Sequence, residues 1–474
     1  MLFSLAYLGN AAANFLFGIV VGGVLGPAEY GRYATAALAA TVVAALAFDW
    51  LRLSTNRFWL ALPDPNRASA SLEAGFFVVS ATLFALAALA WGLGLDFGLG
   101  GKLIALALVL AIANARFDYR GARLRARELP KGFVRLSLAR QGLLFTAVLG
   151  VAACTRNSAA TIAALALSQA VASLAARGLD DVDIKRARWL DLRTFAVYSA
   201  PVVVATALFM AIGLVNREIA MARFGAAATG KLSLATDLSF RLFMAFNFLP
   251  ETVLFQIAMR REASEGAAAA RGQIRLNQVY ALALIAPVAV GYMVMAPTFE
   301  ALIVPKAFRG EYAILARDLA PGFLAYCGVY AICNPLFQLA RRTWPIALAA
   351  LAAFVADLVL TALPRFSSDI EGLAQAHSAS LILGFAAAAC LAMRQTRGKP
   401  RWRDLSAIAI SSALMATAIR PLNAIPNAPL AAMLALLAGS AVFGAALVVF
   451  DVAGSRQALL ARMKLGEATE LTAR

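Results

Sequence analysis

Histidine is nearly absent from this chain and cysteine is scarce, and both facts exclude kinds of chemistry. His377 is the only histidine among 474 residues, so a histidine-based metal site or proton relay is excluded. Cys154, Cys327, Cys333 and Cys390 lie in apolar stretches without the spacing of a metal site or a disulfide framework. We interpret them as small hydrophobic residues, and we expect neither a metal nor a cofactor.

Long polar segments are also missing. Only 15% of the residues are charged, and no segment outside the apolar stretches is long enough to fold alone. The chain contains no Gly-x4-Gly-Lys-Ser/Thr phosphate loop, which indicates that it has no nucleotide-binding module and does not itself use ATP. Short loops also count against a membrane glycosyltransferase or polymerase, because such an enzyme needs an acceptor-binding loop beside its acid or base.

Hydrophobic residues are abundant: they make up 62% of the chain, and the mean hydropathy is +0.75. This composition predicts an all-α polytopic membrane protein, since a span needs about 20 mostly apolar residues. The first basic residue is Arg32, so we expect Met1 to Leu25 to be a retained first span and not a cleaved signal peptide. We count about fourteen spans, of which the fifth and thirteenth are the weakest, centred near residues 14, 46, 83, 109, 146, 168, 205, 246, 287, 328, 354, 383, 412 and 440.

The net charge of +17 is distributed unevenly between the two sides of these spans. With the N-terminus inside, the inner segments hold 31 of the 43 lysines and arginines, and the outer loops hold 11. The positive-inside rule therefore predicts a multi-pass cytoplasmic-membrane protein with both termini cytoplasmic, and we expect no nucleic-acid partner. The densest inner run, Arg116 to Arg127, is interpreted as a topology anchor that touches anionic membrane lipids, with a substrate role as the alternative.

A short motif near residue 26 recurs near residue 225. Shifting the chain by 199 positions places Gly26, Ala28, Gly31, Arg32 and Ala36 on Gly225, Ala227, Gly230, Lys231 and Ala235. Glycine allows positive φ, and proline disfavours helix in the residue before it. We therefore expect a glycine hinge between two helices in each copy.

Ionisable residues inside spans are costly, and they are the main pointers to function. The eighth span carries Asp237, Arg241 and Glu251 on one helical face, within about 80° of one another together with two apolar residues. Asp237 and Arg241 are spaced to satisfy each other, or they line a cavity. Arg217 lies about two turns from the outer end of the seventh span, where it lines a cavity or snorkels outward.

Other spans carry fewer polar groups. Asn10, Asn14, Gly18 and Gly22 form a stripe at i+4 spacing, which favours close helix packing over cavity lining.

An acid and a base, Asp49 and Arg52, stand at i, i+3 near the inner surface and are followed by Arg57. Asp357 is a lone carboxylate in the eleventh span and a candidate for proton or cation coupling. His377 is expected to be a satisfied polar group near an outer helix end.

The run Gly18 to Arg57, with its core Leu25-Gly-Pro-Ala-Glu-Tyr-Gly-Arg-Tyr-Ala34, resembles the Wzx-type polysaccharide flippases of the MOP exporter superfamily. The resemblance implies two pseudo-symmetric six-helix lobes (1–180 and 190–395), two further spans (404–450) and a cytoplasmic tail (451–474). It also implies a transporter that flips an undecaprenyl-diphosphate-linked oligosaccharide by alternating access. Expected partners are that lipid-linked substrate, membrane lipids and other polysaccharide-assembly proteins.

Such a headgroup needs a hydrated, cationic passage, because unpaired polar groups are costly in hydrocarbon. The candidate substrate-binding residues combine the polar groups of several spans: Arg217, Arg241, Asp237, Glu251, Asn14, Asp49, Arg52 and Arg57. Arg52 and Arg57 are placed at the cytoplasmic mouth, and Asp357 is the ion-coupling candidate. The alternatives are a multidrug/cation antiporter of the same superfamily, in which carboxylates would dominate the cavity, a membrane glycosyltransferase or polymerase, and a structural scaffold.

Overall fold

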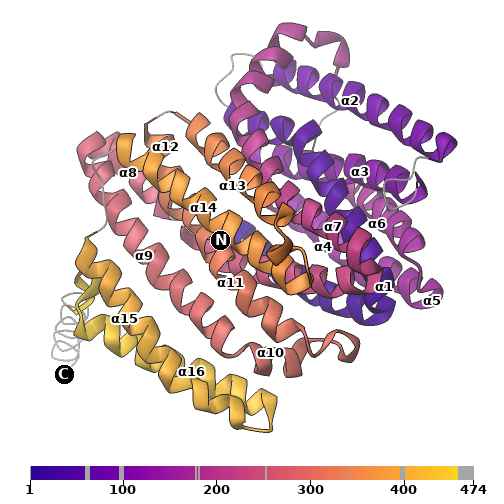
Figure 1. The fold of residues 1–474 in the computed structure, drawn as a ribbon. Helices are drawn as coiled ribbons and strands as arrows, with labels where there is room; N and C mark the ends of the chain where they lie inside the picture. Colours follow the sequence, from indigo (N-terminus) through magenta and orange to yellow (C-terminus); the bar gives the residue numbers. More distant parts are fainter. Residues whose placement is uncertain are drawn as a thin grey trace, which may run out of the picture. The chain divides into compact units, whose positions relative to one another are not determined.

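A computed structural model of the chain describes residues 2–58, 65–94, 101–176, 179, 182–250, 254–340, 342–395 and 401–456. This part of the chain is helical and contains no strand (Figure 1). The helices are α1 (Leu2–Phe58), α2 (Pro65–Leu93), α3 (Gly101–Ala126), α4 (Pro130–Leu143), α5 (Leu149–Thr155), α6 (Ser158–Ser173), α7 (Trp189–Leu249), α8 (Phe255–Glu265), α9 (Ala267–Val294), α10 (Ala296–Ile303), α11 (Tyr312–Gly328), α12 (Asn334–Leu339), α13 (Trp344–Ala362), α14 (Ile370–Gln395), α15 (Trp402–Ile419) and α16 (Ala428–Val449).

The helices confirm the predicted all-α membrane architecture. Ten helical segments of the described chain are long and apolar enough to cross a bilayer, and they include both of the weakest predicted spans, in Pro130–Thr155 and Trp402–Ala424. Two of the ten, in α1 and α7, are each bent once and supply two arms apiece. Counting each arm, and adding the arginine-rich α3 and the 16-residue α6, accounts for the fourteen predicted spans in the described residues.

The bends lie at the two matched glycines. Gly26 has φ 73° and ψ 170°, and Gly225 has φ 82° and ψ 176°. This region of backbone space is essentially restricted to glycine, so the predicted positive φ is confirmed in both copies. Pro27 follows the first bend, whereas Ala226 follows the second. Glycine is therefore the shared determinant of the bend, and proline is not required.

The second matched glycines bring the two copies together. A Cβ atom added to Gly31 would lie 2.8 Å from the backbone nitrogen of Gly230 and closer still to the carbonyl oxygen of Ala226. A Cβ atom added to Gly230 would collide with the backbone of Pro27. The second arm of α1 (27–58) and the second arm of α7 (226–249) thus cross backbone to backbone, as small residues allow in membrane helices.

The first copy of the motif makes one contact that the second copy does not make. The backbone N–H of Ser158, at the start of α6, donates to Glu29 Oε2 at 2.8 Å, and Arg32 pairs with the same carboxylate. An acid at a helix N-terminus is favourable because it meets the positive end of the helix dipole. Ala228 occupies the matching position in α7 and carries no such group.

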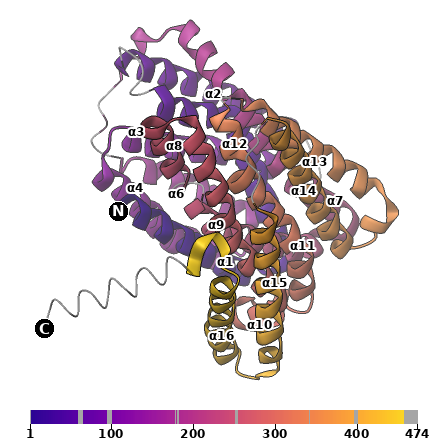
Figure 2. The same cartoon turned by 90° about the vertical axis from the view of Figure 1, so that its left-hand side faces the viewer.

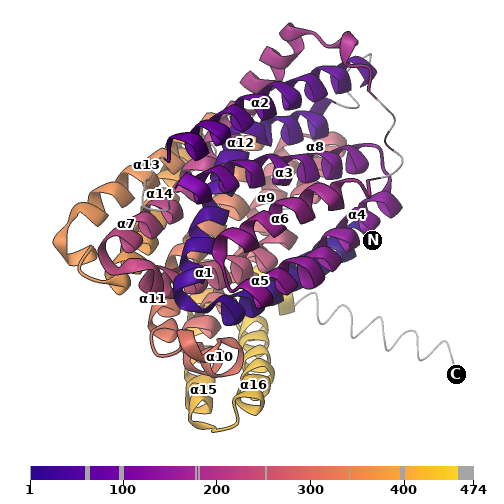
Figure 3. The same ribbon diagram turned by 90° about the vertical axis from the view of Figure 1, so that its right-hand side faces the viewer.

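The chain divides into two compact units: residues 1–241, 305–308 and 346–380 form unit 1, and residues 242–304, 309–345 and 381–474 form unit 2. In unit 1, α3 packs against α1, α2 and α6, and Figure 3 shows α3 and α6 side by side. The core of α1, α2 and α3 contains Phe48, Leu51, Phe76 and Tyr119.

In unit 2, α15 and α16 form a hairpin that is visible in Figure 2. They enclose a second apolar cluster around Met415 and Phe443.

Candidate functional site

A polar cavity of about 550 Å³ lies inside unit 1. Both arms of α1 contribute to its walls, together with α3, α4, α6 and the first arm of α7 (189–224). The lining residues are Asn10, Ala11, Asn14, Thr41, Ala44, Ala45, Asp49, Arg52, Asn114, Phe117, Asp118, Gly121, Arg125, Phe133, Ser137, Arg140, Gln169, Thr206 and Met210. Three of the sequence-predicted candidates, Asn14, Asp49 and Arg52, are therefore brought together here.

The arginine-rich end of α3 divides into two faces. Residues 114, 117, 118, 121 and 125 follow the helical period and line the cavity. Residues 116, 120, 123 and 127 lie on the opposite face, about half a turn away. This periodicity is the signal that could have identified Asn114, Asp118 and Arg125 from the sequence.

The opposite face of α3 packs against its neighbours. Arg116 Nη1 lies 2.5 Å from one oxygen of Glu73, and Arg123 Nη1 lies 3.7 Å from the other. Arg120 donates to the carbonyl oxygen of Ser173 at 2.6 Å. The predicted lipid-touching anchor is wrong for Arg123, which is buried, and Arg125 lines the cavity instead.

Three guanidinium groups and two carboxylates set the charge of the cavity wall. Asp49 accepts two hydrogen bonds from Arg52, from Nε and Nη2, both at 3.2 Å. Arg140, which the sequence reasoning missed, lies with its guanidinium carbon 5.1 Å from the centre of the Phe117 ring, and Arg125 similarly contacts Phe133. The lining therefore carries one net positive charge when all five groups are ionised.

Carboxamide groups supply the neutral polar part of the wall. Gln141 Nε2 donates to Asn10 Oδ1 at 3.1 Å and reaches Asn14 Oδ1 at 3.5 Å. Asn10 in turn donates to Ser137 Oγ at 3.1 Å. The polar half of the Asn10-to-Gly22 stripe thus serves both predicted purposes, because its two asparagines pack against α4 and line the cavity.

The glycine half of that stripe makes room for other groups. A Cβ atom on Gly18 would collide with Arg241 Nη1, and one on Gly22 would lie 3.6 Å from the ring of Tyr30. Arg241 also donates to the main-chain oxygen of Asn14, a residue of the cavity wall. Arg241 therefore lies against the first arm of α1 (2–25), next to the cavity but not among the residues that line it.

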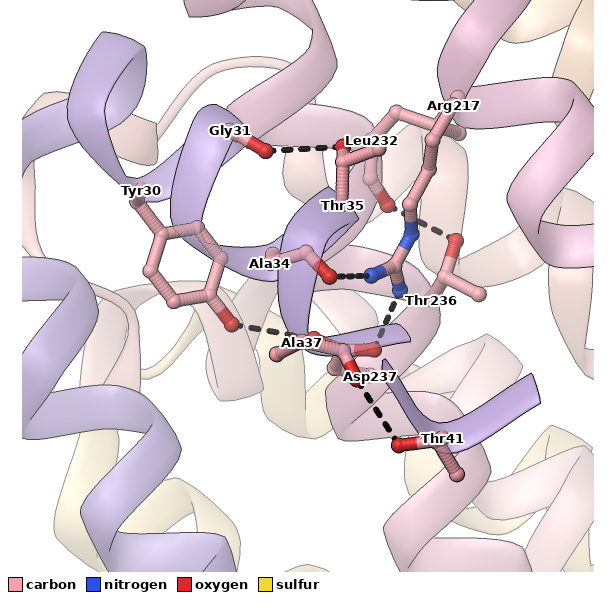
Figure 4. Close-up of polar contacts among 10 residues, drawn as sticks. All are labelled: Tyr30, Gly31, Ala34, Thr35, Ala37, Thr41, Arg217, Leu232, Thr236 and Asp237. Atoms are coloured by element: carbon pink, nitrogen blue, oxygen red, sulfur yellow. Dashed lines mark hydrogen bonds and ion pairs between the residues drawn. The ribbon is translucent and has the colours of Figure 1, made fainter. Parts of the chain in front are cut away.

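Arg217 and Asp237 form a separate network, which Figure 4 shows. The side chain of Arg217 is 3% exposed, and its guanidinium donates both to Asp237 and, at 2.8 Å, to the carbonyl oxygen of Ala34. The hydroxyl of Tyr30 donates to the other oxygen of Asp237 at 3.2 Å. Asp237 does not form the i, i+4 pair with Arg241 that its spacing allowed. The network links the two arms of α7 across the Gly225 bend, and neither charged residue lines the cavity.

Asp357 on α13 is fully buried and has a partner that the sequence did not reveal. Asn216 Nδ2 lies 3.0 Å from both of its carboxylate oxygens, and Ser380 is also within hydrogen-bonding reach. The buried Oδ1 of Asn216 has no hydrogen-bond partner among the described residues. His377 is likewise buried, two turns into α14. No lysine or arginine in the described chain forms an ion pair with Asp357.

Glu251 lies outside the described residues, and so does the side chain of Arg57, whose backbone belongs to the last turn of α1.

The solved structures similar to this chain include a flippase and multidrug transporters. The chain is similar to the lipid II flippase MurJ in an inward closed conformation, with a TM-score of 0.68, 13% identity, and coverage of 95% of this chain and 98% of the MurJ chain. It is also similar to an inward-facing multidrug resistance MATE family transporter of the MOP superfamily (TM-score 0.57, 13% identity, 85% and 96% covered). A MATE structure in the straight conformation aligns at a TM-score of 0.53, with 13% identity and 85% and 94% covered.

No protein-family model and no curated protein sequence matches the chain. At 13% identity the structural likeness establishes the fold alone, which this chain shares with the MurJ flippase and the MATE transporters. Among these structures, the MurJ flippase aligns over nearly the whole of both chains.

Proposed function

We propose that this protein is a flippase of the Wzx type, which moves an undecaprenyl-diphosphate-linked oligosaccharide across the bacterial cytoplasmic membrane by alternating access. The observation that carries the proposal is the cavity in unit 1, where Arg52, Arg125 and Arg140 line the same space as several carboxamide and hydroxyl groups. The likeness to the lipid II flippase over 95% of the chain supports the same class of transport.

The chemistry of the wall suits a glycosylated diphosphate. Guanidinium groups form strong, often bidentate hydrogen bonds with phosphate oxygens. Side chains such as Asn114 and Gln169 can both donate to and accept from sugar hydroxyl groups. A headgroup that leaves water for this cavity would thereby exchange its hydration for protein hydrogen bonds, which lowers the cost of crossing the membrane.

The multidrug/cation antiporter is the second candidate because MATE transporters share the fold. A site for organic cations favours carboxylates and aromatic faces over arginines. Here arginines outnumber carboxylates in the wall, and Asp49 is already paired with Arg52. The composition of the cavity therefore favours an anionic headgroup.

Asp357 remains the proposed coupling residue. A buried carboxylate held by an amide and a hydroxyl, without a basic partner, is suited to exchange a proton or a small cation. We further propose that both termini of the protein are cytoplasmic. Membrane lipids and polysaccharide-assembly proteins are the proposed partners of the protein.

Flipping can be tested in proteoliposomes that contain the full-length protein and a polyprenyl-diphosphate-linked N-acetylglucosamine disaccharide. A soluble glycosyltransferase added outside modifies only headgroups that have reached the outer leaflet. Arg125→Ala and Arg140→Ala should each reduce flipping at least about tenfold, because each removes a charge-assisted hydrogen bond to phosphate.

Arg135→Ala is the matched control for Arg140→Ala, since Arg135 lies on the same helix, α4, but is exposed and does not line the cavity. Absence of flipping by the wild-type protein, or equal flipping by all four proteins, would argue against this function for the cavity.

A further inference from the structure

Asp118 differs from Asp49, the other carboxylate of the cavity wall, in its bonding. It lies on the cavity face of α3 and its side chain is exposed to the cavity. No hydrogen bond or close ion pair joins it to any residue that the structure describes. Asp49, the second carboxylate of the wall, is by contrast held by two hydrogen bonds from Arg52.

Asp118 nevertheless lies within electrostatic range of all three cavity arginines. Arg140 acts on its carboxylate most strongly, followed by Arg52, then by the like charge of Asp49 and last by Arg125. A ligand whose phosphates approach these arginines must therefore come close to a negative charge as well. Nearby unit charges repel in a cavity whose effective dielectric constant is well below that of water.

We propose that Asp118 is a specificity-determining residue that limits the anionic charge of the headgroup in this cavity. With Asp118 ionised, the three arginines are offset by two carboxylates, and the wall keeps one net positive charge. The diphosphate is attracted to that positive charge, whereas a second anionic group on the attached sugar is repelled by Asp118. The preferred substrates thus carry neutral or cationic sugars next to the diphosphate, and uronic acids are disfavoured. This inference rests on the proposed function of the same cavity.

The size of the effect follows from Coulomb repulsion. Two like charges about 10 Å apart at an effective dielectric constant of about 20 repel strongly enough to change an affinity roughly tenfold. The neutral isostere asparagine keeps the volume of Asp118 and can still bond a hydroxyl group, so Asp118→Asn removes the charge alone.

Binding should be measured on the full-length protein in nanodiscs with two probes, polyprenyl-diphosphate-glucose and polyprenyl-diphosphate-glucuronate. The probes differ only in the carboxylate at C6. The wild type should bind the glucose probe about tenfold more tightly than the glucuronate probe. In Asp118→Asn this ratio should fall to about two or less, mainly through tighter binding of the glucuronate probe.

Asn114 provides a matched variant that tests the same idea in the opposite direction. It lies one helical turn before Asp118 on the cavity face of α3, so Asn114→Asp adds a carboxylate at nearly constant volume. This variant should increase the preference for the glucose probe.

Three outcomes would overturn the inference. Equal binding of both probes by the wild type would contradict it while leaving the proposed function in place. An unchanged ratio in both variants would show that the preference does not come from charge at this position. Failure of the wild type to bind either probe would refute the proposed function, and the inference with it.

Discussion

Loss of Arg217 and loss of Asp237 should lower the stability of the protein by different amounts, although the two residues form one ion pair. Asp237→Asn leaves the Arg217 guanidinium buried, at 3% exposure, with the carbonyl oxygen of Ala34 as its remaining acceptor. Arg217→Met fills a similar volume and leaves Asp237, which is 23% exposed and still bonded by Tyr30. The first change isolates a buried charge, whereas the second leaves a partly exposed carboxylate that keeps one hydrogen bond.

The expected magnitudes follow from this difference in burial. Removing one partner of a fully buried pair costs about 3–5 kcal/mol. Because Asp237 is partly exposed, we expect about 2–3 kcal/mol of lost stability for Asp237→Asn and about 1 kcal/mol for Arg217→Met. The double variant removes both charges, so it should be more stable than Asp237→Asn alone, and the cycle should give a coupling energy of about 2 kcal/mol, which exceeds the cost of Arg217→Met.

Thermal unfolding in detergent, followed by tryptophan fluorescence, gives the order of stability of the wild type, the two single variants and the double variant. The reasoning would be refuted by a double variant that is no more stable than Asp237→Asn, or by an Asp237→Asn protein that unfolds like the wild type. Binding of the lipid-linked probe by the Arg217→Met protein provides a separate control. A stable Arg217→Met protein that no longer binds the lipid-linked probe would support the substrate role predicted from the sequence over a structural one.

Three further predictions concern the bends, the coupling residue and the topology. Gly26→Ala should lower the stability of the protein by about 1–3 kcal/mol, because φ 73° with ψ 170° strains any residue with a Cβ atom. Gly23→Ala is the control on the same helix, where the new Cβ contacts only Pro305, at 3.4 Å. Equal unfolding midpoints of the two variants would contradict this prediction. Asp357→Asn should abolish the dependence of flipping on a proton or Na⁺ gradient, and retained dependence would dismiss it as the coupling residue. In a cysteine-free background, cysteines at the exposed positions Ala227 and Asn427 should react with an impermeant thiol reagent from outside, and one at Ala268 should not. The opposite labelling pattern would invert the assignment of all loops.

The sequence was sufficient to predict the features that depend on local periodicity. Spans follow from apolar length, and the bends follow from Gly26 and Gly225, because few other residues adopt their backbone conformation. Asn14, Asp49 and Arg52 could be chosen as polar residues of the first two spans, and they do line one cavity.

Partners from distant segments could not be predicted in the same way. Arg140 and Arg125 reach the same cavity only because α4 packs against α3, and nothing in either helix specifies that neighbour. Arg217 meets Asp237 because the bend at Gly225 folds the two arms of α7 toward each other, so their 20-residue separation gave no i, i+4 signal. Asn216 meets Asp357 over 141 residues, which is why the carboxylate looked isolated in the sequence.

The differences between the two copies of the motif have a physical reason in these contacts. Both copies need the first glycine for the bend and the second for the crossing, and these positions are the same in both. Glu29 and Tyr30 each bond a group outside their own copy, namely the N-terminus of α6 and the carboxylate of Asp237. The matching residues, Ala228 and Thr229, make no such bond, and the Thr229 hydroxyl donates only to the carbonyl of Gly225 within its own helix. Backbone geometry therefore explains what the repeat retains, and side-chain partners explain where its copies differ.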